Sequence, residues 1–194
     1  MTLKHTRAPS FFHWTLALVI TCTVVAAPCL HAQQSGPTEN EVKSAYLYNF
    51  GKFVEWPAKA TNVGEFFTIC VLGDDTFGST LATTIASETI NGKKVVVKRV
   101  AKSPDAMSCR ILFISSSQQN RLKEILAELD STSVLTVSDM PEFTLRGGMI
   151  QFVVEAKKVR FAVNLTSAER TGLALSSQLL KVAIDVKRSA HPGS

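Results

Sequence analysis

Apolar residues recur at helical spacing in two parts of the chain. The first series starts at Val42 and continues at i+3, i+4, i+8, i+11 and i+12, which is one face of a helix. Because Pro57 disfavours helical geometry at Trp56, this series predicts a helix over 41–56. The second series, at i, i+3, i+4 and i+7 from Leu122, predicts a helix over 122–129.

Short apolar runs with the character of buried strands separate these helices. They cover residues 66–72, 95–97, 111–114 and 134–137. Nearly continuous apolar runs are typical of parallel strands that are buried on both faces. A further helix, with Phe77, Leu81 and Ile85 at i, i+4 and i+8, is predicted between the first two runs. Strands that alternate with helices predict a single α/β domain, layered around a largely parallel sheet.

The pattern changes after Gly148. The runs 149–155 and 159–164 are joined by residues 156–158 alone, and apolar side chains alternate with more polar ones along the second run. This alternation predicts an antiparallel hairpin at an edge of the sheet. Flanking helices are predicted over 166–171 and 177–187.

The N-terminal end has a different character. Lys4, His5 and Arg7 precede the apolar run 16–27, and small residues follow it up to Ala32. The run is shorter than the roughly 20 residues that a spanning helix needs, and this order of segments is typical of a secretory signal. We therefore expect a signal peptide over 1–32, a polar linker over 33–40, the α/β domain over 41–187 and a polar tail over 188–194. The alternative is an uncleaved anchor helix that extends back to Phe11.

Removal of the predicted signal peptide changes which side chains are left for catalysis or metal binding. Three of the four histidines leave with it, and the fourth, His191, lies in the tail. Imidazole is the usual general base near neutral pH and the commonest metal ligand, so we expect no enzyme activity, no metal and no cofactor. The remaining 19 basic and 16 acidic residues give a net charge of +3 that is scattered along the chain. This modest excess argues against nucleic acid as a partner.

Two cysteines remain after the leader, Cys70 and Cys109. In an exported protein an isolated pair forms a structural disulfide more often than a redox or metal site. We therefore expect a Cys70–Cys109 disulfide.

Polar side chains follow three of the predicted strands. In an open α/β sheet, ligands bind beyond the carboxyl ends of the strands, and hydroxyls with helix N-termini can hold a small anion or an amino-acid-like ligand there. The same residue types also serve as helix caps and turns, so both interpretations stay open. The members of this candidate ligand edge are Asp74, Asp75, Ser115, Ser116 and Ser138.

Aromatic residues of the helix over 41–56 form a candidate interaction surface. They cannot all point one way, because residues i and i+2 lie on different faces of a helix. Some aromatic area is therefore left for another chain, such as a homodimer mate, unless neighbouring elements of the same domain cover it. Two leucines of the C-terminal region join the candidates, although we favour a place in the core for them. The candidates are Tyr46, Tyr48, Phe53, Trp56, Leu175 and Leu179.

Six segments of the chain form a recognisable series: 45–57, 69–73, 109–115, 147–150, 159–164 and 176–183. In this order and spacing they resemble the YfiR family of small periplasmic proteins. The resemblance covers about residues 41–184. Cys70 and Cys109 match the disulfide positions of that family, which supports the pairing. Some members carry a second cysteine pair around the Gly-Gly turn, and this chain has no cysteine near Gly147.

The resemblance implies a regulatory function. It implies that this protein, like members of the YfiR family, is a non-enzymatic, dimeric periplasmic protein that binds an inner-membrane diguanylate cyclase of the YfiN type and represses it. Repression of the cyclase is expected to lower cyclic di-GMP signalling and biofilm formation. An outer-membrane lipoprotein of the YfiB type is expected to sequester the repressor. The alternative from another class is a periplasmic small-molecule-binding protein that uses the candidate ligand edge.

Overall fold

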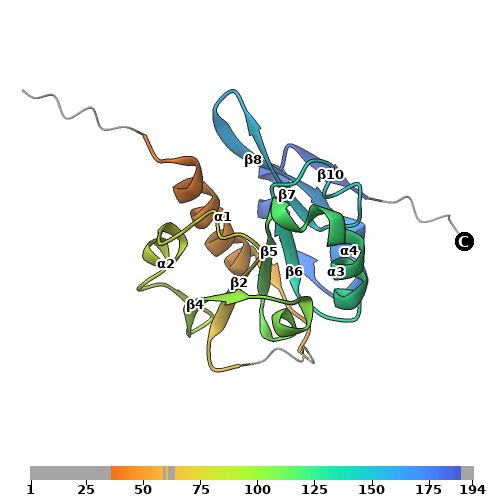
Figure 1. The fold of residues 1–194 in the computed structure, drawn as a ribbon, viewed down its shortest axis with the longest axis horizontal. Helices are drawn as coiled ribbons and strands as arrows, with labels where there is room; N and C mark the ends of the chain where they lie inside the picture. The colour runs from red at the N-terminus through yellow and green to blue at the C-terminus, as the bar shows by residue number, and fades with distance from the viewer. Residues whose placement is uncertain (1–35, 59, 61–63, 189–194) are drawn as a thin grey trace, which may run out of the picture. The chain divides into compact units, whose positions relative to one another are not determined.

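An eight-stranded sheet runs through the structure in the order β10-β8-β7-β6-β5-β2-β4-β3 (Figure 1). The computed structural model describes residues 36–58, 60 and 64–188, so the predicted signal peptide and nearly all of the predicted tail lie outside the described residues. The strands of the sheet are β2 (Phe67–Leu72), β3 (Thr89–Ile90), β4 (Lys93–Val100), β5 (Ile111–Ile114), β6 (Leu135–Ser138), β7 (Ile150–Glu155), β8 (Lys158–Asn164) and β10 (Asp185–Lys187).

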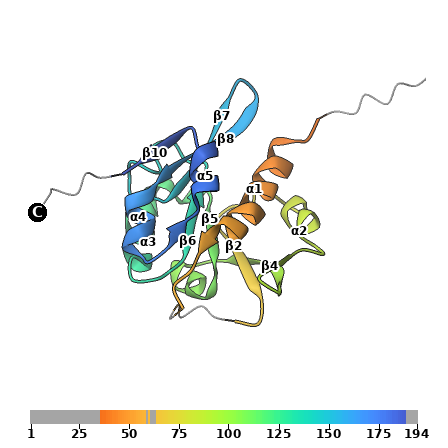
Figure 2. The same cartoon turned by 180° about the vertical axis from the view of Figure 1, so that it is seen from behind.

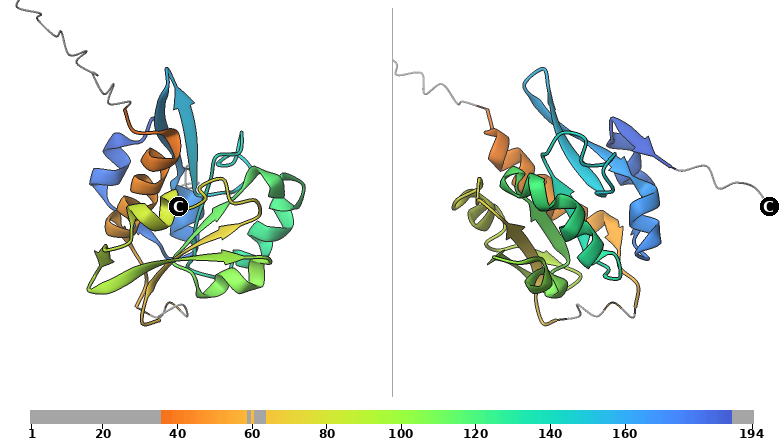
Figure 3. Two further views of the ribbon diagram at one scale, coloured as in Figure 1. Left: turned by 60° about the vertical axis from the view of Figure 1, so that its left-hand side comes forward. Right: turned by 45° about the vertical axis from the view of Figure 1, so that its right-hand side comes forward.

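Five neighbouring strands of the sheet are parallel to one another: β4, β2, β5, β6 and β7. β8 is antiparallel to β7 and forms a hairpin with it, and this hairpin extends beyond the rest of the sheet in every view (Figures 1 and 3). The predicted fold class, an α/β domain with a largely parallel sheet, an antiparallel hairpin and flanking helices, is confirmed.

Each face of the central strands has its own core. Ile69, Phe113 and Leu135 point to one face, which is covered by α1 (Glu39–Phe53), α2 (Thr80–Thr84), α4 (Leu165–Arg170) and α5 (Ser177–Val182). Cys70 and Leu112 point to the other face, which is covered by α3 (Leu122–Leu129) and the 3-10 helix η1 (Ser103–Ser108). Since both faces are buried, these strands are apolar at consecutive positions, as the sequence indicated.

Helix α1 begins and ends earlier than predicted. Thr38 and Glu41 form a capping box, in which each side chain accepts from the backbone N–H of the other. The helix therefore starts at Glu39, inside the stretch that we assigned to the linker. It ends at Phe53, because Val54–Glu55 form strand β1, which pairs antiparallel with β9 (Ala174–Leu175) in a second, two-stranded sheet.

Gly51 lets α1 pack closely on the sheet. A Cβ atom at this position would lie 2.5 Å from Ile90 Cδ1 and 2.9 Å from Phe67 Cζ, closer than real Cβ contacts. Glycine in a helix interior costs about 1 kcal/mol relative to alanine. The close approach of helix and sheet outweighs that cost here.

The helix predicted around Leu81 is shorter than its spacing indicated. Phe77, Leu81 and Ile85 are all buried, but only Thr80–Thr84 is helical. Gly78 has a positive φ of 56°, which a right-handed helix does not contain. The helix therefore cannot extend back to Phe77.

The predicted helix over 177–187 is wrong beyond Val182. Ala183 is extended, and the Ile184 N–H donates to the Phe161 carbonyl oxygen, which starts strand β10. This strand pairs parallel with the end of β8. The alternation predicted that the hairpin forms an edge of the sheet. At residues 162–164 this is wrong, because β10 lies outside β8 there. Local spacing could not reveal this pairing, because the partner strand lies far away in sequence.

A disulfide joins Cys70 of β2 to Cys109, just before β5, as expected. Both residues are fully buried in the core that α3 covers. The bond closes a loop with a sequence separation of 39 residues. It thus ties β2 to the start of the strand beside it.

Replacement of both cysteines with alanine is expected to lower the free energy of unfolding by about 4 kcal/mol, because the unfolded chain regains the entropy of the open loop. Urea denaturation of the two proteins measures this difference. Wild-type protein in a strong thiol reductant is the control and should fall to nearly the same stability. An unchanged unfolding midpoint in the variant would show that the disulfide does not stabilise the fold.

Candidate functional site

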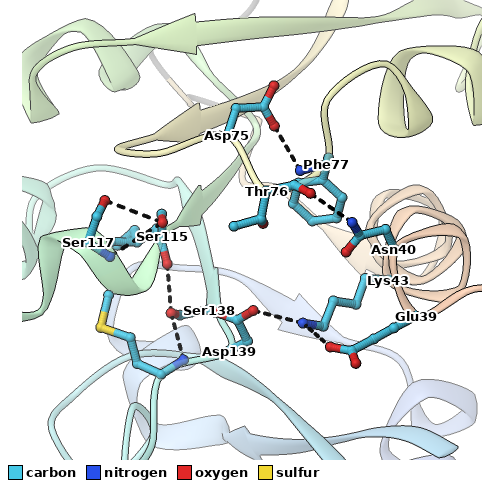
Figure 4. A network of polar contacts seen from close by, with 12 residues as sticks. Glu39, Asn40, Lys43, Asp75, Thr76, Phe77, Ser115, Ser117, Ser138 and Asp139 are labelled. Atoms are coloured by element: carbon cyan, nitrogen blue, oxygen red, sulfur yellow. Dashed lines mark hydrogen bonds and ion pairs between the residues drawn. The ribbon is translucent and has the colours of Figure 1, made fainter.

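The carboxyl ends of β2, β5 and β6 meet at one edge of the sheet, and the first half of α1 lies across it (Figure 4). The structure thus brings the candidate ligand edge together, as parallel strands require. Figure 4 also shows residues of α1 among these polar groups, which the sequence analysis did not anticipate. Asn40 donates from Nδ2 to the Thr76 carbonyl oxygen at 2.7 Å, which fixes α1 to the loop after β2.

Lys43 is the charged centre of this edge. Its side chain is only 6% exposed, and its Nζ lies 2.7 Å from Asp139 Oδ2 and 2.7 Å from Glu39 Oε1. Burial by itself lowers the pKa of Lys43, but the hydrogen bonds and charges of Asp139 and Glu39 together outweigh burial and raise the pKa. A buried ammonium that is paired in this way is a structural link between α1 and β6.

The serines of the edge act as caps. Ser138 Oγ donates to the Ile114 carbonyl oxygen at 2.6 Å and accepts from the Met140 N–H at 3.1 Å. Ser115 caps the 3-10 helix η2 (Ser116–Arg121) by accepting from the Ser117 N–H. Ser116 is the exposed first residue of that helix. The turn and cap alternative therefore accounts for Ser115 and Ser138.

The two aspartates of the edge lie in different environments. Asp75 accepts from the N–H groups of Phe77 and Gly78 and pairs with Arg99, whose Nη2 lies 2.6 Å from Asp75 Oδ2. Asp74 is exposed, and its backbone N–H donates to Ser117 Oγ. The polar groups collected at this edge mainly bond to one another and to α1.

The candidate interaction surface divides into separate places. An apolar groove of about 320 Å³ runs between α1, α5 and β8, and Tyr46 and Phe53 line it. Tyr46 packs edge-on against Phe161, with ring centroids 5.3 Å apart. Figure 2 shows α5 beside α1 on this side of the sheet. The other lining residues are Asn49, Phe50, Phe161, Gln178, Leu179 and Val182.

The remaining candidates of that surface lie elsewhere or inside the domain. Leu179 is 3% exposed, so its side chain belongs mainly to the core, even though it also lines the groove. Tyr48 donates from its hydroxyl to the Thr89 carbonyl oxygen. Trp56 packs edge-on against Phe67, with ring centroids 5.4 Å apart. Leu175 pairs with Val54 in the two-stranded sheet. The helix thus distributes its aromatic residues over several neighbours within the domain.

Two kinds of feature are not found in the part of the chain that the structure describes. No helix among residues 36–58, 60 and 64–188 is long and apolar enough to cross a bilayer. Within the same ranges, no three or more histidine, cysteine, aspartate or glutamate side chains converge in a way that could hold a metal ion.

The profile of a protein family matches residues 40–184, from the second residue of α1 to the residue before β10. That family is described as YfiR/HmsC-like. The chain belongs to the YfiR/HmsC-like family. The match spans the groove and the polar edge, so both are built from the family domain.

Two solved structures are similar in fold. One is a conserved domain protein from Vibrio cholerae O1 biovar El Tor, at 13% identity and a TM-score of 0.55, over 77% of this chain and 60% of that chain. The other is the ABC domain in complex with L-Trp from Streptococcus pneumonia, at 13% identity and a TM-score of 0.47, over 62% of this chain and 55% of that chain. The chain thus spans little more than half the length of either structure. At this identity, the likeness to the Vibrio protein concerns the fold alone.

Lys43→Met is expected to lower the free energy of unfolding by about 1–3 kcal/mol, because it leaves the half-buried Asp139 carboxylate without its partner. Glu39→Gln is the matched control, since it removes the other, exposed partner of the same ammonium and should cost less than about 1 kcal/mol. Chemical denaturation of each variant measures the difference. Equal losses in the two variants would contradict the structural role of the Lys43–Asp139 pair.

The same pair gives a direction for pH dependence. Because the pKa of Lys43 is raised in the folded protein, its contribution is fully present below the ordinary lysine pKa of about 10.4 and is lost as the pH rises through the raised value. As the pH rises from neutral, the stability difference between wild type and Lys43→Met should therefore shrink only once the pH is strongly alkaline. A difference that vanished between pH 6 and pH 8 would exclude this origin.

Proposed function

We propose that the protein is a non-enzymatic regulator that works in the periplasm, where it binds an inner-membrane diguanylate cyclase of the YfiN type and represses it. Membership of the YfiR/HmsC-like family supports this function. The bonding of the polar edge supports it as well, because the side chains best placed for a small ligand there are engaged as caps and ion pairs. We therefore do not propose the edge as a ligand site.

The observation that carries the proposal is the apolar surface beside the α1–α5 groove. Val182, Ile184 and Val186 expose 63%, 39% and 37% of their area, and we call these three residues the α5 surface. Val182 also lines the groove, and Val186 lines a second hollow with Leu180. The three exposed side chains thus fall within residues 182–186, beside two hollows that α5 helps to form, and exposed apolar surface of this kind is typical of sites of protein association.

Repression needs only a difference in affinity. The regulator binds the inactive conformation of the cyclase more tightly than the active one and thereby shifts the equilibrium. To convert a cyclase that is about 99% active into one that is about 99% inactive, the two affinities must differ by about 10⁴-fold, or about 5.5 kcal/mol. A compact cluster of buried apolar anchors supplies energies of this order in protein interfaces.

Relief of repression follows from competition. A lipoprotein of the YfiB type that binds the same regulator lowers the free concentration available to the cyclase, so the cyclase returns to its active state by mass action. The resemblance to the YfiR family also implies a homodimer. A dimer would present two α5 surfaces, and a partner that contacts both at once gains from the raised effective concentration at the second contact.

Deletion of the gene is expected to raise intracellular cyclic di-GMP, and complementation with the wild-type gene should restore the lower level. Val182→Lys should fail to restore it, because a charge in an apolar contact must be desolvated on binding. Leu145→Lys is the matched control: Leu145 is 65% exposed, against 63% for Val182, and lies outside the groove. Cyclic di-GMP is measured in extracts, with the amount of regulator verified by immunoblot.

Two results would contradict the proposal at different levels. An unchanged cyclic di-GMP level on deletion, under several growth conditions, would exclude repression of a cyclase. Full complementation by Val182→Lys would leave repression standing but exclude the α5 surface as the site of contact.

A further inference from the structure

A second cavity, of about 540 Å³, lies at the opposite edge of the sheet from the polar edge. It is formed where β2, β4 and β5 begin and where the chain leaves α1. Trp56, Pro57, Phe67 and Ile90 provide apolar wall, and Lys52, Lys93 and Arg110 provide three cationic side chains against one acidic residue, Glu55. Its volume falls within the range of pockets that hold small molecules.

Two hydrogen-bond donors in the wall of this cavity have no partner. Trp56 Nε1 and Arg110 Nη1 are shielded from solvent, and neither has a hydrogen-bond partner within residues 36–58, 60 and 64–188. An indole nitrogen and a guanidinium can only donate. Buried donors without acceptors are rare in folded proteins, because they lose their bonds to water on folding. Each of the two donors therefore has an unused hydrogen bond that an oxygen acceptor of a ligand can satisfy.

The charge of Arg110 indicates what kind of acceptor fits. Burial lowers the pKa of the Arg110 guanidinium, but an arginine stays protonated at neutral pH. Arg110 takes part in none of the ion pairs found in the described ranges. Its guanidinium carbon lies over the Trp56 ring, 5.7 Å from the ring centroid. A half-buried cation of this kind is best satisfied by an anionic oxygen.

The backbone holds these donors in fixed positions. The Arg110 N–H donates to the Thr68 carbonyl oxygen, and the Arg110 carbonyl oxygen accepts from the Leu135 N–H, so residue 110 is tied to the strands on both sides. Its neighbour Cys109 is fixed by the disulfide. The Trp56 ring contacts two groups, the Phe67 ring edge-on and the Arg110 guanidinium over its face. A binding group held in this way loses little entropy when a ligand arrives.

We propose that this cavity binds a small organic anion, whose carboxylate or phosphate oxygens accept from Trp56 Nε1 and Arg110 Nη1 and whose apolar part packs on the Trp56–Phe67 wall. Lys52 and Lys93 add positive charge at the same cavity. Because the two donors are shielded, a ligand reaches them only when a side chain of the wall shifts. Binding therefore changes the surroundings of the Trp56 indole, which gives a direct measurement.

The test follows the Trp56 indole N–H signal in ¹H–¹⁵N spectra of the purified protein, with the signal assigned by Trp56→Phe. Benzoate, phenyl phosphate and the neutral benzyl alcohol are titrated at constant ionic strength. We expect at least one of the two anions to shift the signal saturably, with a dissociation constant of about 1 mM or tighter, and benzyl alcohol to bind at least about tenfold more weakly. The stronger of the two anions identifies the oxyanion.

Arg110→Gln should weaken binding of that anion by about tenfold or more, because it removes the charge. Arg160→Gln is the matched control, since Arg160 is exposed on β8 and outside the cavity, and it should bind as wild type. The comparison of benzoate with benzyl alcohol needs no variant and stands if Arg110→Gln fails to fold. No saturable shift with either anion, equal binding of benzyl alcohol, or unchanged binding by a folded Arg110→Gln would each overturn the proposal. None of these results depends on cyclic di-GMP, so they leave the repression of a cyclase to its own test.

Discussion

Burial of both faces of β2, β5 and β6 is the constraint on which the rest of the structure depends. Apolar strands of this kind are stable only if helices cover each face, because the sheet otherwise exposes one apolar layer to water. α3 and η1 cover one face, and α1 with α2, α4 and α5 covers the other. The disulfide lies inside the first of these cores. Loss of either layer would expose side chains such as Ile69 or Leu112, which are now fully buried.

Helix α1 connects the two edges of the sheet and gives them different properties. At its N-terminal half, Lys43 and Asn40 bond to the carboxyl edge and engage the polar groups there. At its C-terminal end, the chain turns into β1 and carries Trp56 across to Phe67, beside the unpartnered guanidinium of Arg110. The edge that ordinarily binds ligands in α/β sheets thus carries a salt bridge to α1, and the opposite edge holds the cavity.

The end of α1 also joins the two surfaces to which we assign binding. Phe53 lines the groove beside the α5 surface, and its neighbour Lys52 lines the cavity. A ligand in the cavity changes the affinity for a protein partner only if it binds two conformations of this segment differently. The β1–β9 pairing follows directly after Phe53 and consists of only two residue pairs. It is therefore the element of this segment that changes conformation at the lowest cost.

The sequence by itself determined the elements whose signal is local: the apolar runs of β2 and β5, the face of α1, the spacing of α3, and the hairpin. It also placed Asp75, Ser115 and Ser138 at one edge, because parallel strands must end together. Tertiary structure decided what those side chains bond to. It also decided the end of α1 at β1, the replacement of helix by β10 after Val182, and the pairing of Trp56 with Arg110. Each of these depends on contacts between segments far apart in the chain, and periodicity within a segment carries no information about them.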